Sequence, residues 1–245
     1  MAGTPYSKAQ VDAAGRRWTG YLALPADERD RLGTGDPDFV RELLAANEVI
    51  EWWRREHAYP LTKVNAGLRH YLNLYGRPRV TQRLKKWPTI IYKLQRHPTM
   101  RLSAMQDIGG LRAILPNQAA VDEIAQRLRR NWRSRLVAEY DYAREPKESG
   151  YRAVHLVAKQ DERRIELQLR TPWQDMWAQS AEEDTARLGL GLKFGLGPDD
   201  LREYYRLMAD VIAAREEGKL VNEGVVARLA ELHPQMRRYF SRHRK

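Results

Sequence analysis

The apolar residues of the first hundred positions recur with the period of helices, about 3.6 residues. Ser7 is a predicted N-cap, and further helices are predicted over residues 36–58 and 61–74, the second of which stops at Gly76. Prolines then bracket a short helix at residues 88–98. None of the long helices before Gly76 carries an obvious chemical motif.

After about residue 110, apolar and polar residues alternate, and helical stretches separate the alternating segments. Strands are predicted over residues 111–115, 136–142, 152–159 and 164–171, and helices over residues 121–132 and 172–187. A glycine-rich loop at residues 189–200 precedes two further helices. The pattern predicts a central sheet with helices against it, in an α+β or mixed α/β domain.

The last predicted strand has the sequence RIELQLRT. Glu166, Gln168 and Arg170 occupy alternate positions and share one face, while apolar residues occupy the other face. A carboxylate, an amide and a guanidinium on a half-buried strand need partners, which a phosphorylated ligand and a divalent metal would supply. The alternative is an ordinary amphipathic edge strand with its polar side in water.

A second candidate carboxylate lies just before the first alternating strand, in the segment QDIGGLRAIL. Asp107 precedes the strand, Gly109 and Gly110 permit a tight approach, and Arg112 lies on the strand. Asp107 and Glu166 are therefore expected at the edges of two strands of one sheet, where two carboxylates can hold Mg²⁺ between phosphates. Each alone also fits a cap or a surface acid.

The segment ESGYRAVH, residues 148–155, contains a turn at Gly150. We expect this turn to expose Tyr151, so that its ring can stack on a nucleobase. The alternative is a tyrosine folded back onto the core.

Composition excludes several classes of protein. The chain of 245 residues can bury a substantial core, and it has no secretory signal and no apolar run long enough to span a bilayer, so we expect a soluble cytoplasmic protein. The absence of cysteine excludes disulfides, thiolate metal sites and a cysteine nucleophile. The histidines lack the spacing of a zinc site.

Positive charge is in excess, with 43 Lys and Arg against 32 Asp and Glu, a formal net charge of +11. Three stretches hold basic residues and no acid: residues 77–101 with eight, 127–135 with five and 237–245 with five. Tryptophan and tyrosine lie among these residues, a mixture suited to nucleic acid. A well-solvated arginine-rich surface is the alternative interpretation.

Four motifs occur in the order found in the synthetase domain of the RelA/SpoT family, which this chain resembles over about residues 77–180. They are RxK with a downstream helical lysine (Arg83, Lys85, Lys93), DxxGxR (Asp107, Gly110, Arg112), YxxxPKxxGYRAxH (residues 142–155) and ExQxRT (residues 166–171), followed by Trp177. Members of the family transfer the β,γ-pyrophosphate of ATP to a ribose 3′-hydroxyl. The resemblance implies a nucleotidyltransferase-like fold, a mixed sheet flanked by helices.

The resemblance also implies a role for each motif residue. The phosphates of ATP would be bound by Arg83, Lys85, Lys93 and Arg112. Asp107 and Glu166 would bind Mg²⁺, and Glu166 is the candidate base for the proton of the 3′-hydroxyl. The acceptor would be bound by Lys147, Tyr151, His155, Gln168 and Arg170, with Tyr151 stacked on its base.

Two further features concern the acceptor and the organisation of the chain. The family's Glu-His pair after the tryptophan is replaced by Ala181 and Glu182, which puts standard handling of guanosine in doubt. No His-Asp hydrolase motif precedes the synthetase motifs. We expect a helical region at residues 1–76, a pyrophosphokinase core at 77–188 and a glycine-rich loop with basic helices at 189–245.

The acceptor is predicted from charge and from the resemblance. The basic stretches favour the 3′-CCA end of tRNA, which would make the protein a translation-blocking toxin with an antitoxin as partner. The alternative acceptor is GDP or GTP, giving the alarmone (p)ppGpp. A third possibility is an inactive fold that only binds RNA or regulates, but the intact Asp107 and Glu166 argue against it.

Overall fold

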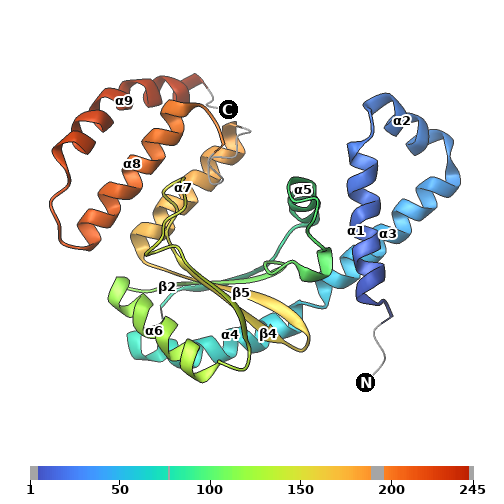
Figure 1. Cartoon of the computed structure of the whole chain (residues 1–245), viewed down its shortest axis with the longest axis horizontal. Helices are drawn as coiled ribbons and strands as arrows, with labels where there is room; N and C mark the ends of the chain where they lie inside the picture. Colours follow the sequence, from blue (N-terminus) through green and yellow to red (C-terminus); the bar gives the residue numbers. More distant parts are fainter. Residues whose placement is uncertain (1–4, 77, 189–195, 243–245) are drawn as a thin grey trace. The chain divides into compact units, whose positions relative to one another are not determined.

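The computed structural model describes residues 5–76, 78–188 and 196–242 (Figure 1). The helices are α1 (Lys8–Ala23), α2 (Ala26–Gly35), α3 (Pro37–Arg55), α4 (Ala58–Leu72), α5 (Trp87–Arg96), α6 (Gln118–Asn131), α7 (Pro172–Leu188), α8 (Asp199–Glu216) and α9 (Glu223–Arg242), with short 3₁₀ turns η1 (Asn73–Tyr75) and η2 (Leu102–Ala104). The strands are β1 (Val80–Leu84), β2 (Gly109–Ile114), β3 (Leu136–Asp141), β4 (Val154–Gln160) and β5 (Arg163–Arg170). No helix within these described ranges is long and apolar enough to cross a membrane.

Local sequence explains where the first helices begin and end. The Ser7 hydroxyl accepts a hydrogen bond from the backbone N–H of Gln10, and the Gln10 side chain accepts one from the Ser7 N–H, which completes a capping box. Asp36 caps α3 through the N–H of Phe39, at 2.9 Å. The turn η1 directly follows α4, and Gly76, with φ of 67°, ends η1. These starts and stops confirm the helices predicted from the cap and breaker residues.

The strands form a five-stranded sheet in the order β1-β2-β5-β4-β3. β4 and β5 are joined by a two-residue turn in which Asp161 and Glu162 both have positive φ, 48° and 61°, as the tightest hairpin turns require. Along β5, buried and half-buried residues alternate up to Gln168, as the sequence predicted. The fold is α+β, a mixed sheet flanked by helices.

The prediction of helices alone in the first hundred residues is wrong at β1. This strand pairs with β2 through the N–H of Lys85 and the carbonyl of Ile108, at 2.7 Å, and through the N–H of Ile114 and the carbonyl of Arg79, at 3.0 Å. Its residues are exposed or half-buried, so no buried face gives an alternating pattern. Pairing with β2, and not local sequence, makes this segment a strand.

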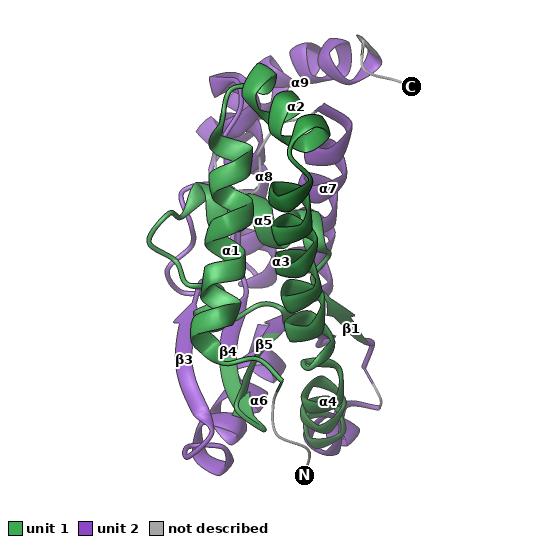
Figure 2. Ribbon diagram, turned by 90° about the vertical axis from the view of Figure 1, so that its right-hand side faces the viewer, with its two compact units in different colours: residues 1–68, 81–111, 157–167 green, residues 69–80, 112–156, 168–245 purple. Residues whose placement is uncertain are grey.

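The contacts divide the chain into two compact units (Figure 2). Unit 1 comprises residues 1–68, 81–111 and 157–167, and unit 2 comprises residues 69–80, 112–156 and 168–245. In unit 1, α1 packs against α3 and α5 around a buried apolar core. This core comprises Val11, Ala14, Ala46, Ile50, Trp53, Ile90, Ile91, Leu94, Leu102, Met105 and Ile108. In unit 2, α7 packs on α8 and α8 on α9 around Tyr151, Trp177 and Tyr205. The division into regions 1–76, 77–188 and 189–245 stays a prediction, and residues 189–195 of the glycine-rich loop lie outside the described residues.

The two glycines that open β2 differ in their surroundings. A Cβ on Gly109 would lie 2.7 Å from Cδ1 of Ile165 and 3.6 Å from Cβ of His57. A Cβ on Gly110 would meet no described atom within 4 Å. The tight approach predicted for both glycines therefore occurs at Gly109.

We expect Gly109→Ala to lower the free energy of unfolding by about 1–3 kcal/mol, because the added methyl overpacks the contact with Ile165. Gly110→Ala is the matched control and should change that free energy by less than about 0.5 kcal/mol. Urea denaturation of both variants measures the difference. Equal stabilities would show that the Gly109 contact is not tight.

Candidate active site

Asp107 lies between two lysines of unit 1. Its Oδ2 is 3.0 Å from Nζ of Lys85, and its Oδ1 is 2.8 Å from Nζ of Lys93. Lys85 follows β1, Lys93 lies on α5, and Asp107 precedes β2. The three side chains are 12%, 29% and 19% exposed in the order Lys85, Lys93, Asp107, so water screens these pairs less than it screens surface ion pairs.

Opposing effects determine the protonation of Asp107. Burial raises the pKa of its carboxyl, but the charges of Lys85 and Lys93 outweigh burial and hold the pKa below its ordinary value of 3.8. The charge of Glu166 acts in the same direction as burial, which identifies Glu166 as an electrostatic neighbour of Asp107. At neutral pH, Asp107 is therefore a carboxylate.

The donor set agrees with a Mg²⁺ ion shared with a nucleotide. Asp107 and Glu166 are half-buried carboxylates within electrostatic reach of each other. Among the described residues, no group of three or more acidic, histidine or cysteine side chains forms a complete cage for a metal. Mg²⁺ is commonly held by one or two carboxylates, with substrate phosphates and water completing its coordination.

The backbone of Lys85 is fixed from two sides. Its N–H donates to the carbonyl of Ile108, and its carbonyl accepts from Nε of Arg54 at 2.8 Å. Glu51 in turn holds Arg54, at 3.2 Å. Arg54 thus links the helical N-terminal region to the backbone of Lys85. It was not predicted from the sequence, because a helical arginine carries no distinguishing local signal.

The two arginines predicted to bind phosphates are Arg83 and Arg112, and neither forms an ion pair with Asp107 within the described residues. Arg83 is exposed on β1, and no ion pair to it is found within the described part of the chain. Arg112 belongs to unit 2, where its Nη1 is 3.2 Å from Asp175 and its Nη2 is 3.7 Å from Glu182. Glu182 occupies one of the two positions where the family has its Glu-His pair. This departure from the family pattern therefore places an acid beside Arg112.

Asp175 is the charged centre of unit 2. Its side chain is 2% exposed and forms ion pairs with Arg79, Arg112 and Arg170, at 2.5, 3.2 and 3.3 Å. It lies in the first turn of α7, where the helix dipole also favours a negative charge. Asp175 was not among the predicted site residues, although an acid just after ExQxRT in a predicted first turn was a usable signal.

Four of the predicted acceptor-binding residues meet in one hydrogen-bonded group. The Tyr151 hydroxyl is 2.7 Å from Nε2 of His155 and accepts a hydrogen bond from Nη2 of Arg170. The same Arg170 nitrogen donates to Oε1 of Gln168, at 2.9 Å. The fifth, Lys147, is exposed and places its Nζ 5.3 Å from the centre of the Tyr151 ring.

The prediction that the Gly150 turn exposes Tyr151 is wrong. Tyr151 is 1% exposed and packs in the core of unit 2, with its ring centroid 6.2 Å from that of Trp177. The alternative interpretation, a ring folded back onto the core, describes the structure. The stacking role of Tyr151 stays a prediction.

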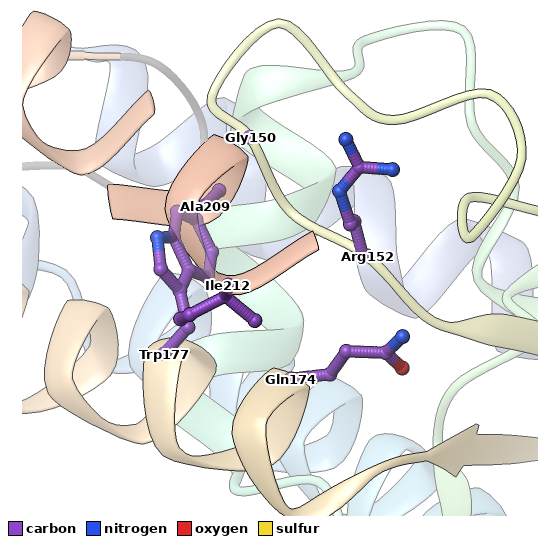
Figure 3. A pocket seen from close by; sticks show the side chains of 6 residues that line it. All are labelled: Gly150, Arg152, Gln174, Trp177, Ala209 and Ile212. Atoms are coloured by element: carbon purple, nitrogen blue, oxygen red, sulfur yellow. The ribbon is translucent and has the colours of Figure 1, made fainter. Parts of the chain in front are cut away.

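Helix α8 covers the turn that carries Tyr151. Gly150 has φ of 87°, and a Cβ there would lie 2.7 Å from Cβ of Ala209. Figure 3 shows the small cavity at this contact, lined by Gly150, Arg152, Gln174, Trp177, Ala209 and Ile212. Its volume of ≈ 10 Å³ leaves room for about one water and no nucleotide.

The motifs and the geometry agree with the comparisons to known proteins. Residues 82–187 match the model of the region found in RelA / SpoT proteins. The crystal structure of small alarmone synthetase 2 from Bacillus subtilis superposes with a TM-score of 0.54 at 22% identity, over 65% of this chain and 91% of that one. This chain carries a RelA/SpoT-family synthetase domain.

Relatives of the RelA/SpoT domain are also found by sequence. GTP pyrophosphokinase YjbM of Bacillus subtilis is 32% identical over 109 residues, 40% of this chain and 52% of the relative. The uncharacterized protein Rv1366 of Mycobacterium tuberculosis is 31% identical over 147 residues, 55% of this chain and 52% of the relative. The chain thus spans about half the length of these curated relatives.

We expect Asp175→Asn to lower the free energy of unfolding by about 3–5 kcal/mol, because three arginines would lose their buried counter-charge. The matched control is Asp199→Asn, which alters an ion pair with Arg202 whose aspartate is 93% exposed. Thermal and urea denaturation should show a large loss for the first variant and no measurable loss for the second. Comparable small losses would contradict a structural role for Asp175.

The lowered pKa of Asp107 predicts a pH dependence. A carboxyl whose folded-state pKa is below its unfolded value contributes stability above the unfolded pKa, and that contribution is lost as pH falls through the folded pKa. The free energy of unfolding of the wild type should exceed that of Asp107→Asn by about 1–3 kcal/mol above about pH 5. This difference should narrow below about pH 4. Urea denaturation at several pH values measures it; a gap independent of pH would exclude the ion pairs as its cause.

Proposed function

We propose that this protein is a Mg²⁺-dependent pyrophosphokinase that transfers the β,γ-pyrophosphate of ATP to a ribose 3′-hydroxyl. The observation that carries the proposal is the ionised Asp107 held between Lys85 and Lys93, with Glu166 as its neighbour, inside a RelA/SpoT domain. The 32% identity to a GTP pyrophosphokinase over 109 residues supports the same class of reaction.

The charges suit transfer between two polyanions. The acceptor oxygen attacks the β-phosphorus of ATP, the bond from that phosphorus to the α,β-bridging oxygen breaks, and AMP leaves. Lys85 and Lys93 would exchange Asp107 for the phosphate oxygens and stabilise their growing charge. Bound Mg²⁺ would supply neutralisation of the phosphates. Asp107 and Glu166 would hold it, with Glu166 also taking the proton of the 3′-hydroxyl.

For the acceptor, we favour the 3′ end of tRNA. The net charge of +11 is the supporting observation, because it suits a polyanion larger than a nucleotide. Some basic residues are compensated internally, since Arg127 pairs with Glu123 and Nε of Arg129 lies 2.7 Å from Glu139. Others remain exposed: Arg130, Arg133, Arg237 and Arg238. A tRNA with a blocked 3′ end cannot be aminoacylated, so this activity would act as a toxin that an antitoxin partner neutralises.

A guanosine nucleotide is the second candidate acceptor. It is favoured by the relative named GTP pyrophosphokinase, whose matched region includes about half of that protein. On this acceptor the reaction would make (p)ppGpp. The two candidates share the donor and the transfer chemistry and differ in what binds beyond the reacting ribose.

The deciding experiment incubates the purified protein with γ-labelled ATP, Mg²⁺ and either deacylated tRNA, GDP or GTP. We expect label on tRNA, falling steeply as salt increases because phosphate contacts release counterions. Label on guanosine nucleotides alone would establish the second candidate. The variants Asp107→Asn and Glu166→Gln should each lose at least about a hundredfold in rate; retained biological effect in both would establish a binding module instead.

A further inference from the structure

Two tyrosines of unit 2 form a parallel pair at the end of the edge strand β3. The centroids of the Tyr140 and Tyr142 rings are 5.8 Å apart, and the ring planes are within 4° of parallel. β3 is the last strand of the sheet, so it has a neighbour on one side only. Tyr140 is 40% exposed, which leaves its ring accessible from solvent.

The register of β3 sets the direction of this pair. Arg129 of α6 contacts Glu139, at 2.7 Å, and Asp141, at 3.7 Å. Because side chains alternate along a strand, Tyr140 lies on the face opposite these acids. The ring of Tyr142, the residue after β3, is parallel to that of Tyr140. A slip by one residue would reverse both faces, so the ion pairs with Arg129 oppose it.

A lysine and the acceptor cluster border the same pair. Lys147 places its Nζ 4.4 Å from the centre of the Tyr142 ring. The Tyr142 ring also makes T-shaped contacts with His155, with centroids 5.2 Å apart, and with Tyr151, at 6.0 Å. Arg144, in the same loop as Lys147, has a side chain that is 71% exposed and lies 3.7 Å from Asp141, on the face opposite the two tyrosines. The row of aromatic rings thus continues from the buried Tyr151 outward to Tyr140.

We propose that Tyr140, backed by the parallel ring of Tyr142, is a stacking platform for a terminal base of a single-stranded RNA 3′ end, with Lys147 binding its phosphates. An exposed aromatic ring beside a cation is a common element of sites that bind single strands, since every base has a face that can stack. The buried Tyr151 has no accessible face for this purpose in the structure. The lysine favours a polyanion over a protein strand added to the edge of β3. The inference rests on the proposed function, because it concerns the acceptor of that reaction.

The test measures binding without catalysis. A fluorescein-labelled short single-stranded RNA ending in CCA is titrated with the full chain and followed by anisotropy, in the absence of ATP. Tyr140→Ala should weaken binding at least about fivefold, whereas Tyr140→Phe, which keeps the ring, should bind like wild type. Tyr140 is chosen for truncation because Tyr142 also packs against the Tyr151 and His155 rings.

The matched control is Tyr59→Ala in unit 1. Tyr59 is 68% exposed and also carries a lysine over its ring, Lys63 at 4.5 Å. This variant should bind the RNA like wild type, and all variants should keep the wild-type melting temperature within error. Unchanged RNA affinity in Tyr140→Ala, an equal loss in Tyr140→Phe, an equal loss in Tyr59→Ala, or no RNA binding by wild type would each overturn the platform.

The outcomes separate this inference from the proposed function. Pyrophosphate transfer to RNA that is equal in wild type and Tyr140→Ala, with RNA affinity also unchanged, would overturn the platform and leave the function standing. Ring-dependent RNA binding without any pyrophosphate transfer would support the platform and contradict the function.

Discussion

A carboxylate that keeps its charge away from bulk water needs compensating charges in fixed positions, and Asp107 imposes this requirement on unit 1. Lys85 and Lys93 supply the charges. Lys85 is placed by hydrogen bonds of its backbone to Ile108 and Arg54. Lys93 is placed by α5, whose apolar side packs with α1 and α3. Helices α1 and α3 therefore support the positions of both lysine partners of the carboxylate.

In unit 2, arginines supply the charges that compensate a buried carboxylate. Asp175 is more deeply buried than Asp107 and is surrounded by guanidinium groups, whose planar donors can share one carboxylate in fixed directions. Lysine ammonium groups are compact charges on flexible stems and exchange partners more readily. This difference agrees with a ligand-exchanging role for the Asp107 group and a framework role for Asp175, which holds Arg170 against Tyr151.

The burial of Tyr151 changes how an acceptor base would be recognised. The Tyr151 ring is buried, and its hydroxyl is hydrogen-bonded to His155 and Arg170. In this structure Tyr151 therefore orders the hydrogen-bonded group of acceptor residues. Aromatic surface open to solvent lies instead on β3, at Tyr140. Recognition of a polynucleotide by stacking and phosphate contacts would depend on such accessible rings, whereas recognition of a single nucleotide needs one base site. The choice between the acceptors is therefore a question about the surface beyond the reacting ribose.

The sequence by itself determined the local elements, because their signals lie within a few residues. The capping box at Ser7, the breaker at Gly76 and the alternation along β5 each depend on neighbouring positions and were predictable. The family and its motifs were likewise readable from ordered short patterns. Strand β1 was not, since its conformation comes from pairing with β2.

Only the tertiary structure decided which charges meet and which rings are exposed. Asp175 receives its arginines from β2, β5 and the segment before β1, and Gly150 is covered by a helix nearly sixty residues further along the chain. Arg54 reaches the carbonyl of Lys85 across 31 positions of sequence. Burial and ion pairing are sums over neighbours in space, so a pattern that spans one turn or one strand contains no information about them.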